Sequence, residues 1–76
     1  MTPGQAIGRR VRELRRDLGL SQRHVAQLAG LHASNVVRLE RGKHEPTLTT
    51  VWTVATALGV EPSSILSALD SREVVP

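Results

Sequence analysis

Four glycines cut the chain into short segments, and every segment carries its apolar residues at helical spacing. Gly19, Gly30, Gly42 and Gly59 each follow a stripe in which apolar residues recur about three or four positions apart. A glycine directly after such a stripe is a typical helix end, because it adopts the left-handed backbone conformation without a steric penalty. The first stripe consists of Ile7, Val11, Leu14 and Leu18. The pattern predicts short helices and no strands.

We expect five helices, over residues 3–18, 22–29, 32–41, 48–58 and 62–69. Thr2, Ser21 and Thr47 stand where N-caps are needed, and Pro46 stops helical continuation. The other stripes place core residues at Val25, Leu28, Ala29, Val36, Leu39, Leu48, Val51, Val54, Ala55, Leu58, Ile65, Leu66 and Leu69. The predicted fold class is all-α, in one compact domain over residues 1–70 with a flexible tail at 71–76.

Composition excludes several functional classes. The 76 residues include no Cys, so neither disulfides nor thiolate metal sites can support the fold. Trp52 is the single aromatic residue, so the stacking platforms that bind single-stranded nucleic acid are not expected. His24, His32 and His44 lack metal-ligand spacing, and there is no phosphate-binding glycine loop. We therefore expect no enzyme activity, no cofactor, no metal and no membrane span, and a place in the cytoplasm.

Residues 22–41 carry the pattern of a helix-turn-helix. Ala26 is small at the point where the next helix must cross closely, and Gly30 lies in the tight turn. Leu31 closes the turn, while Val36 and Leu39 form the inner face of the following helix. The residues of its outer face are not needed for the core and are free to enter a groove; they are Ala33, Ser34, Val37, Arg38 and Arg41.

At this level of detail the chain resembles the phage-repressor/Cro-type (XRE-type) helix-turn-helix family of transcriptional regulators. The matching strings are IGRRVRELR at 7–15, GLSQ at 19–22, LERGK at 39–43, PTL at 46–48 and ATALGV at 55–60. Together they extend over about residues 5 to 69, in the order and spacing of the family. The resemblance implies a compact five-helix, lambda-repressor-like DNA-binding domain with the helix-turn-helix in its second and third helices.

The resemblance also implies roles for individual residues. Gln22 corresponds to a family glutamine that bonds a DNA phosphate and braces the recognition helix. Ala33, Ser34 and Arg38 fall where family members read bases, with Val37 beside them. The full expected DNA-binding set is Ser21, Gln22, Arg23, Ala33, Ser34, Asn35, Val37, Arg38, Arg41, Lys43 and His44.

The chemistry of these side chains fits duplex reading. Arg38 can bond guanine O6 and N7 together, which is worth about 1–3 kcal/mol of discrimination. Val37 can touch a thymine methyl, and Ser34 can bond a base or a phosphate. Ala33 departs from the long polar side chains of other members and offers only van der Waals contact. The alternative is that Arg38 is a solvated surface charge and Gln22 a simple first-turn residue.

Two further constellations concern stability and assembly. Arg15 and Glu40 match a family ion pair between the first and third helices, and we expect it to be structural. Trp52 either lies across the last two helices of its own domain or contacts a partner subunit; both interpretations stay open. The expected dimer interface is Trp52, Leu66 and Leu69, with Val74 and Val75 as further candidates.

Charge is distributed unevenly along the chain. The formal net charge is +3, but residues 1–43 hold nine Lys or Arg against three Asp or Glu. Residues 44–76 hold one basic residue against four acidic ones. The basic part contains the helix-turn-helix, so we expect that side to face phosphate and the affinity to fall steeply with salt.

The sequence as a whole predicts a DNA-binding transcriptional regulator, a repressor or controller, in the bacterial or phage cytoplasm on the nucleoid. It would bind a near-palindromic operator as a homodimer, with half-sites about one helical turn, ~34 Å, apart. No small-molecule effector is evident. The alternative is an antitoxin-type protein that binds a toxin partner and autoregulates its operon.

Overall fold

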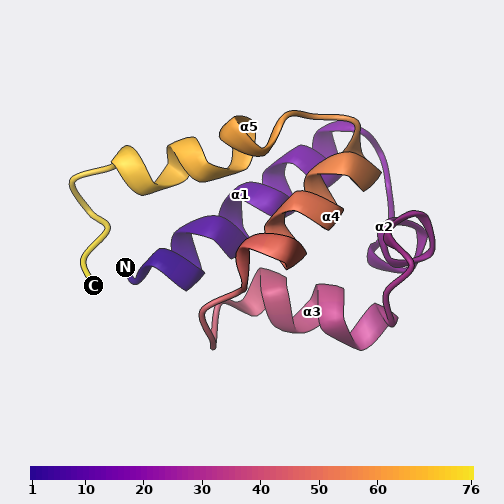
Figure 1. Cartoon of the computed structure of the whole chain (residues 1–76), viewed down its shortest axis with the longest axis horizontal. Helices are drawn as coiled ribbons and strands as arrows, with labels where there is room; N and C mark the ends of the chain where they lie inside the picture. Colours follow the sequence, from indigo (N-terminus) through magenta and orange to yellow (C-terminus); the bar gives the residue numbers. More distant parts are fainter.

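The computed structural model describes all 76 residues, and every regular element in it is helical (Figure 1). The α-helices are α1 (Pro3–Asp17), α2 (Gln22–Ala29), α3 (Ala33–Arg41), α4 (Leu48–Leu58) and α5 (Pro62–Leu66). A short 3₁₀ turn, η1 (Ser67–Asp70), continues directly from α5. The all-α, five-helix prediction is confirmed, although the expected helix over 62–69 is divided into α5 and η1.

Capping fixes where these helices start. The side chains of Thr2, Ser21 and Thr47 accept hydrogen bonds from the backbone N–H three residues later, as expected of N-caps. Thr2 forms a reciprocal capping box with Gln5 at the start of α1. The α3 helix begins after His32, whose side chain makes no capping bond, so tertiary packing has to hold its first turn.

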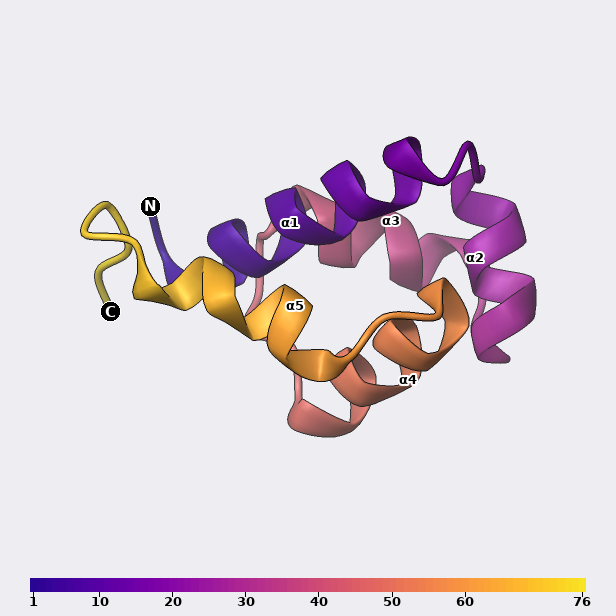
Figure 2. The ribbon, with the colours of Figure 1, turned by 90° about the horizontal axis from the view of Figure 1, so that it is seen from above.

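The helices enclose one apolar core (Figure 2). Helices α1 and α3 pack together, α2 bridges α3 and α4, and α5 packs on α4 and α1. The core cluster consists of Ile7, Val11, Val25, Ala26, Val36, Leu39, Val51, Val54, Ala55, Leu58 and Ile65. Leu14 and Leu66 are partly buried against this cluster, so most of the expected stripes face inward.

Four leucines expected in the core are exposed instead. Leu18 is 51 % exposed because it is the C-cap of α1, one position beyond the last helical turn. Leu48 is 74 % exposed as the first residue of α4, ahead of the point where that helix meets its neighbours. Leu28 is 54 % exposed, since the buried face of α2 is centred on Val25 and Ala26. Leu69 also lies near the surface, at 37 % exposure.

Two glycines inside α1 set how closely that helix approaches the end of α3 and the loop that follows it. A methyl group on Gly8 would collide with the backbone carbonyl oxygens of Leu39 and Glu40. A methyl group on Gly4 would collide with the carbonyl oxygen of His44. Spacing along the sequence did not reveal this packing role, which fixes the C-terminal end of α3 directly on α1.

The two ends of the chain lie side by side (Figure 1). The amino group of Met1 donates to the carbonyl oxygen of Glu73 at 2.6 Å. The backbone N–H of Val75 donates to the carbonyl oxygen of Met1 at 2.8 Å. The flexibility expected of residues 71–76 stays a prediction. None of the helices has the length and apolar character that crossing a membrane requires.

Candidate nucleic-acid interface

The turn between α2 and α3 has the geometry that the sequence predicts. Gly30 has a left-handed backbone with φ of 67°, and the N–H of Leu31 donates to the carbonyl oxygen of Ala26 at 2.9 Å. Ala26 is 2 % exposed. Val36 and Leu39 bury the inner face of α3. The recognition-helix candidate is therefore held by α2 behind it and by α1 at its C-terminal end.

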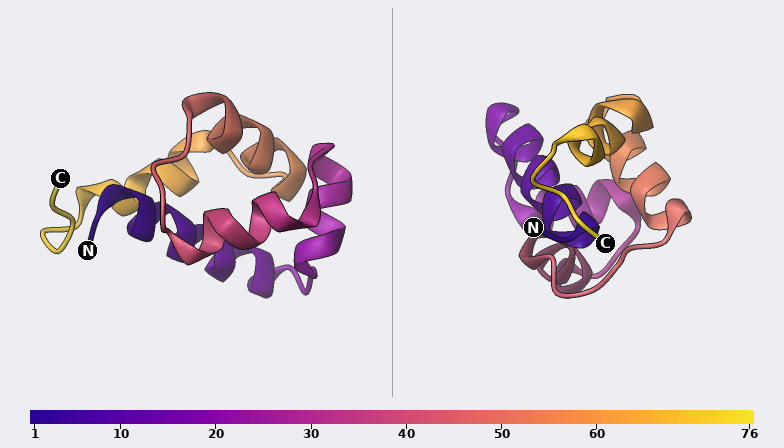
Figure 3. Two further views of the ribbon diagram at one scale, coloured as in Figure 1. Left: turned by 90° about the horizontal axis from the view of Figure 1, so that it is seen from below. Right: turned by 90° about the vertical axis from the view of Figure 1, so that its left-hand side faces the viewer.

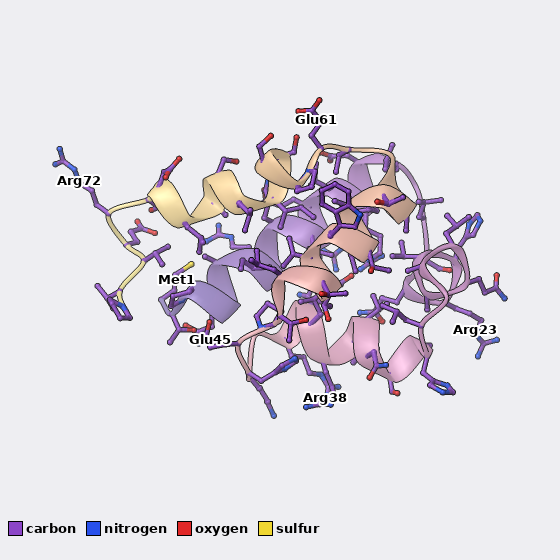
Figure 4. All side chains as sticks on the ribbon, in the orientation of Figure 1. Met1, Arg23, Arg38, Glu45, Glu61 and Arg72 are labelled. Carbon is purple, nitrogen blue, oxygen red and sulfur yellow. The ribbon has the colours of Figure 1, made fainter.

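The opposite face of α3 is open to solvent. Seen from below, α3 lies in front of the rest of the molecule (Figure 3, left). Figure 4 shows Arg38 and Arg23 pointing away from the core. Ser34, Asn35, Arg38 and Arg41 are exposed, and Val37 is half-buried. The structure thus brings most of the expected base-reading residues onto one free surface.

Ala33 differs from its expected place on the outer face. It is half-buried and packs against the apolar core at the start of α3. The small side chain of Ala33 therefore allows the start of α3 to pack close to the core. This reinforces the expectation that position 33 makes no polar contact with a base.

A glutamine at the start of α2 bonds a side chain of α3. The Ser21 hydroxyl accepts from the N–H of His24 at 3.0 Å, which caps the helix. The Gln22 side chain donates through Nε2 to Glu40 Oε1 at 3.1 Å. An amide nitrogen carries two N–H groups, so the second N–H of Gln22 is available to a phosphate.

Glu40 is the centre of a buried polar cluster between α1, α2 and α3. Arg15 donates to it twice, from Nε to Oε2 at 2.7 Å and from Nη2 to Oε1 at 2.9 Å. The third guanidinium nitrogen of Arg15, Nη1, donates to the carbonyl oxygen of Leu20 at 2.9 Å. Arg12 donates from Nε to Oε1 at 3.3 Å. The expected Arg15–Glu40 pair is present, and Arg12 and Gln22 join it, which local spacing does not indicate.

The cluster shifts the protonation equilibria of both partners. Burial by itself raises the pKa of Glu40, but hydrogen bonds from Arg15 and Gln22 and the charge of Arg15 outweigh it. The pKa of Glu40 is therefore lowered. The hydrogen bond to Glu40 raises the pKa of Arg15 above its ordinary value, against a smaller opposing effect of burial.

The basic residues at the end of α3 and in the following loop differ in exposure. Arg41, the last residue of α3, and Lys43, in the loop, are both exposed. Their contact with DNA phosphates stays a prediction. His44 is half-buried, and its Nδ1 is buried without a hydrogen-bond partner. A small hollow between α3 and α4 is lined by Leu31, Asn35, Arg38, Leu39, His44 and Thr50. Thr50 had not been expected near the site.

An apolar surface lies on α4 and α5, at some distance in the sequence from the helix-turn-helix. Trp52 is 65 % exposed, and Leu48 lies one turn before it on the same helix. With Thr49, Val51, Pro62 and Leu66 these side chains line an open, mostly apolar hollow. The indole ring thus borders both elements of its own domain and leaves much of its surface uncovered.

Titratable residues do not gather into a metal site. No group of three or more His, Asp or Glu is placed so that it could hold a metal ion. The arrangement consists instead of a basic outer helix face, a braced helix start and a separate apolar surface.

Comparison with known proteins identifies the family of this chain. Residues 11–65 match the family model Helix-turn-helix (HTH_3). The immunity repressor protein of Bacillus phage phi105 is 35 % identical over 60 residues, which are 79 % of this chain and 42 % of the repressor. The regulator PuuR of Escherichia coli is 36 % identical over 64 residues, 84 % of this chain and 35 % of PuuR. The chain thus spans less than half the length of these two relatives.

Two solved structures extend the comparison. The restriction-modification controller protein C.AhdI from Aeromonas hydrophila has a TM-score of 0.78 and 42 % identity, covering 82 % of this chain and 94 % of the controller. The clp gene regulator ClgR from Corynebacterium glutamicum has a TM-score of 0.86 at 24 % identity and shares the fold. The chain therefore belongs to the XRE-type helix-turn-helix (HTH_3) family of DNA-binding transcriptional regulators, whose members are not enzymes.

Proposed function

We propose that this protein is a sequence-specific regulator that inserts α3 into the major groove of a double-stranded operator. The observation that carries the proposal is the outer face of α3. Arg38 at its centre is exposed, and none of the ion pairs within the chain engages it. A side chain with that freedom can bond guanine O6 and N7 in the groove. Ser34 and Val37 would contact neighbouring base edges.

Phosphate contacts would come from both sides of α3. On one side, Gln22 and the free backbone N–H groups at the start of α2 face the strand, with Ser21 and Arg23 beside them. On the other side, Arg41 and Lys43 reach the backbone from the end of α3 and the loop. Asn35 and His44 border the hollow between α3 and α4, where a phosphate oxygen would meet their side chains.

We further propose that the protein acts as a homodimer on a near-palindromic site. Leu48 and Trp52 are large, exposed apolar residues one turn apart, and the apolar hollow continues from them to Pro62 and Leu66. An aromatic side chain that becomes buried when two subunits associate commonly dominates an interface. Dyad symmetry would place two recognition helices about 34 Å apart, on one face of the duplex.

The similarity to a restriction-modification controller over nearly its whole length favours a controller or small repressor. The phage relative is named an immunity repressor, which fits the same class. No relative reported above is named an antitoxin, so that alternative gains no support from the comparisons. A regulator of this kind would work on the nucleoid, where its operator lies.

Selection of bound sites from a pool of random duplex DNA tests the proposal. The protein is incubated with the pool at low and at moderate salt, and the retained duplexes are sequenced. We expect a near-palindromic site with at least one fixed guanine in each half. Retention of duplexes without sequence preference at both salt concentrations would contradict the proposal.

A further inference from the structure

A single oxygen atom of Glu40 accepts hydrogen bonds from three side chains. Oε1 receives Arg15 Nη2 at 2.9 Å, Gln22 Nε2 at 3.1 Å and Arg12 Nε at 3.3 Å. Oε2 receives Arg15 Nε alone, at 2.7 Å. Three donors exceed the two lone pairs of one carboxylate oxygen, so the donors compete. The longest of the three bonds is that of Arg12.

Arg12 is also the most exposed of the charged members of this cluster. Its side chain is 41 % exposed, against 11 % for Arg15 and 0 % for Glu40. Each of the three guanidinium nitrogens of Arg15 donates one hydrogen bond, to Glu40 or to the carbonyl oxygen of Leu20. Arg12 uses only Nε, which leaves both terminal nitrogens of its guanidinium without a partner in the chain.

The charges of the cluster do not cancel. Two guanidinium groups share one carboxylate, and Arg15 already neutralises that carboxylate through its two bonds. The remaining positive charge belongs to Arg12, at the surface beside the start of α2. Arg9 and Arg10 likewise share one carboxylate, that of Glu13, but this carboxylate is 50 % exposed, so water screens the charge there.

We propose that Arg12 binds a DNA phosphate, together with Gln22, and that Glu40 holds the two side chains beside each other for this contact. The inference rests on the proposed function, because it assumes that the start of α2 meets the DNA backbone. Gln22 turns one N–H toward Glu40 and keeps the other for the strand. Arg12, bonded to the same oxygen, turns its terminal nitrogens to that phosphate or to the next one.

The planar guanidinium of Arg12 can bond Glu40 and a phosphate at the same time. Nε remains on Glu40 while both terminal nitrogens meet phosphate oxygens, so the weak 3.3 Å bond orients the group without neutralising it. Because the contact is to phosphate, it strengthens binding to all duplexes equally and adds no base preference. It places a DNA-binding residue on α1, outside the helix-turn-helix.

The test compares Arg12→Met with Arg9→Met in the full chain. Methionine keeps much of the apolar stem and removes the charge, and Arg9 is a matched control on the same helix, 67 % exposed and paired with Glu13. Affinity is measured against a selected operator duplex across a range of salt concentrations. The slope of log K against log [salt] is negative, and Arg12→Met should make it less steep by about 0.9 for each bound protomer. Affinity should fall roughly tenfold, equally for operator and unrelated duplexes.

A second measurement locates the phosphate. Operator duplexes carrying one uncharged methylphosphonate at a time are bound by the unaltered protein and by Arg12→Met. At one phosphate of each half-site, the methylphosphonate should weaken DNA binding by the unaltered protein. It should have little effect on binding by Arg12→Met. Thermal unfolding of both variants shows whether the fold is intact, and Arg12→Lys should restore most of the salt slope.

The outcomes separate the inference from the function on which it rests. If the unaltered protein shows no operator preference, the proposed function fails and the inference fails with it. If the unaltered protein binds its operator and Arg12→Met has the same salt slope as Arg9→Met, only the inference is overturned. Equal methylphosphonate penalties in the two proteins at every phosphate would overturn it as well.

Discussion

Glu40 joins polar side chains from three helices of this small domain. Its carboxylate is fully buried, yet it is surrounded by donors from α1 and α2 that replace the lost water. A buried ion pair of this kind adds little over a well-packed apolar pair, but removing one partner leaves the other charge buried without compensation. The cluster therefore contributes mainly to fixing α3 against α1 and α2.

Glu40→Ala is expected to lower the free energy of unfolding by about 3 kcal/mol, because Arg15 loses its carboxylate while it remains largely buried. Urea denaturation of the two proteins measures the difference. Glu13→Ala is the matched control, since its ion pairs with Arg9 and Arg10 are exposed and worth little. An unchanged melting temperature in Glu40→Ala would refute this account of the cluster.

The lowered pKa of Glu40 gives stability a definite pH dependence. A carboxyl group whose pKa is lower in the folded state stabilises that state above its unfolded pKa, near its ordinary value of 4.5. The contribution is lost as pH falls through the lower, folded value. We expect the gap in unfolding free energy between the unaltered protein and Glu40→Gln to narrow from about pH 5 downward. A gap that stays constant into that acidic range would show that Glu40 is not involved.

At the scale of the elements, the bounds of the helices can be predicted from local sequence. The contacts between helices cannot. The caps at Thr2, Ser21 and Thr47 and the glycine ends lie where the sequence places them, because both act within a few residues. The exposure of Leu18, Leu28 and Leu48 depends on where neighbouring helices stop. Apolar spacing within one helix carries no information on that point.

The contact of α1 with α3 gives a prediction in which two effects have opposite signs. Helix propensity alone favours Gly8→Ala by about 1 kcal/mol, because alanine restricts the unfolded chain. Packing opposes it, since the added methyl would collide with backbone carbonyl oxygens at the end of α3, which cannot rotate away. We expect net destabilisation of about 2 kcal/mol by urea denaturation. A more stable Gly8→Ala protein would mean that α1 and α3 are not in close contact.

At the scale of the molecule, the site could be predicted in part. The exposed face of α3 follows from the spacing of its buried residues, so the sequence predicts that Ser34, Arg38 and Arg41 are exposed, as they are. Their contacts with DNA stay predictions. The partial burial of Ala33 and His44 depends on the core and on the loop. The convergence of Arg12 and Gln22 on Glu40 joins three helices and leaves no signal in local spacing.

The apolar surface on α4 and α5 predicts how the molecule assembles. Trp52→Ala should weaken self-association roughly thirtyfold, because it removes the largest exposed apolar side chain of that surface. Sedimentation at several protein concentrations measures the change. Leu28→Ala is the control, since Leu28 is exposed to a similar degree on α2, outside the surface. A Trp52→Ala protein that remains dimeric at micromolar concentration would rule out the proposed interface.

Reading of the major groove by α3 is tested most directly by comparing the sites that two proteins select. The unaltered protein and Arg38→Ala are each used to select from the same random duplex pool. The arginine would read one guanine in each half-site, at about 1–3 kcal/mol per contact, so Arg38→Ala should lose its preference at that position and keep the others. Identical selected sites for the two proteins would contradict the placement of α3 in the groove.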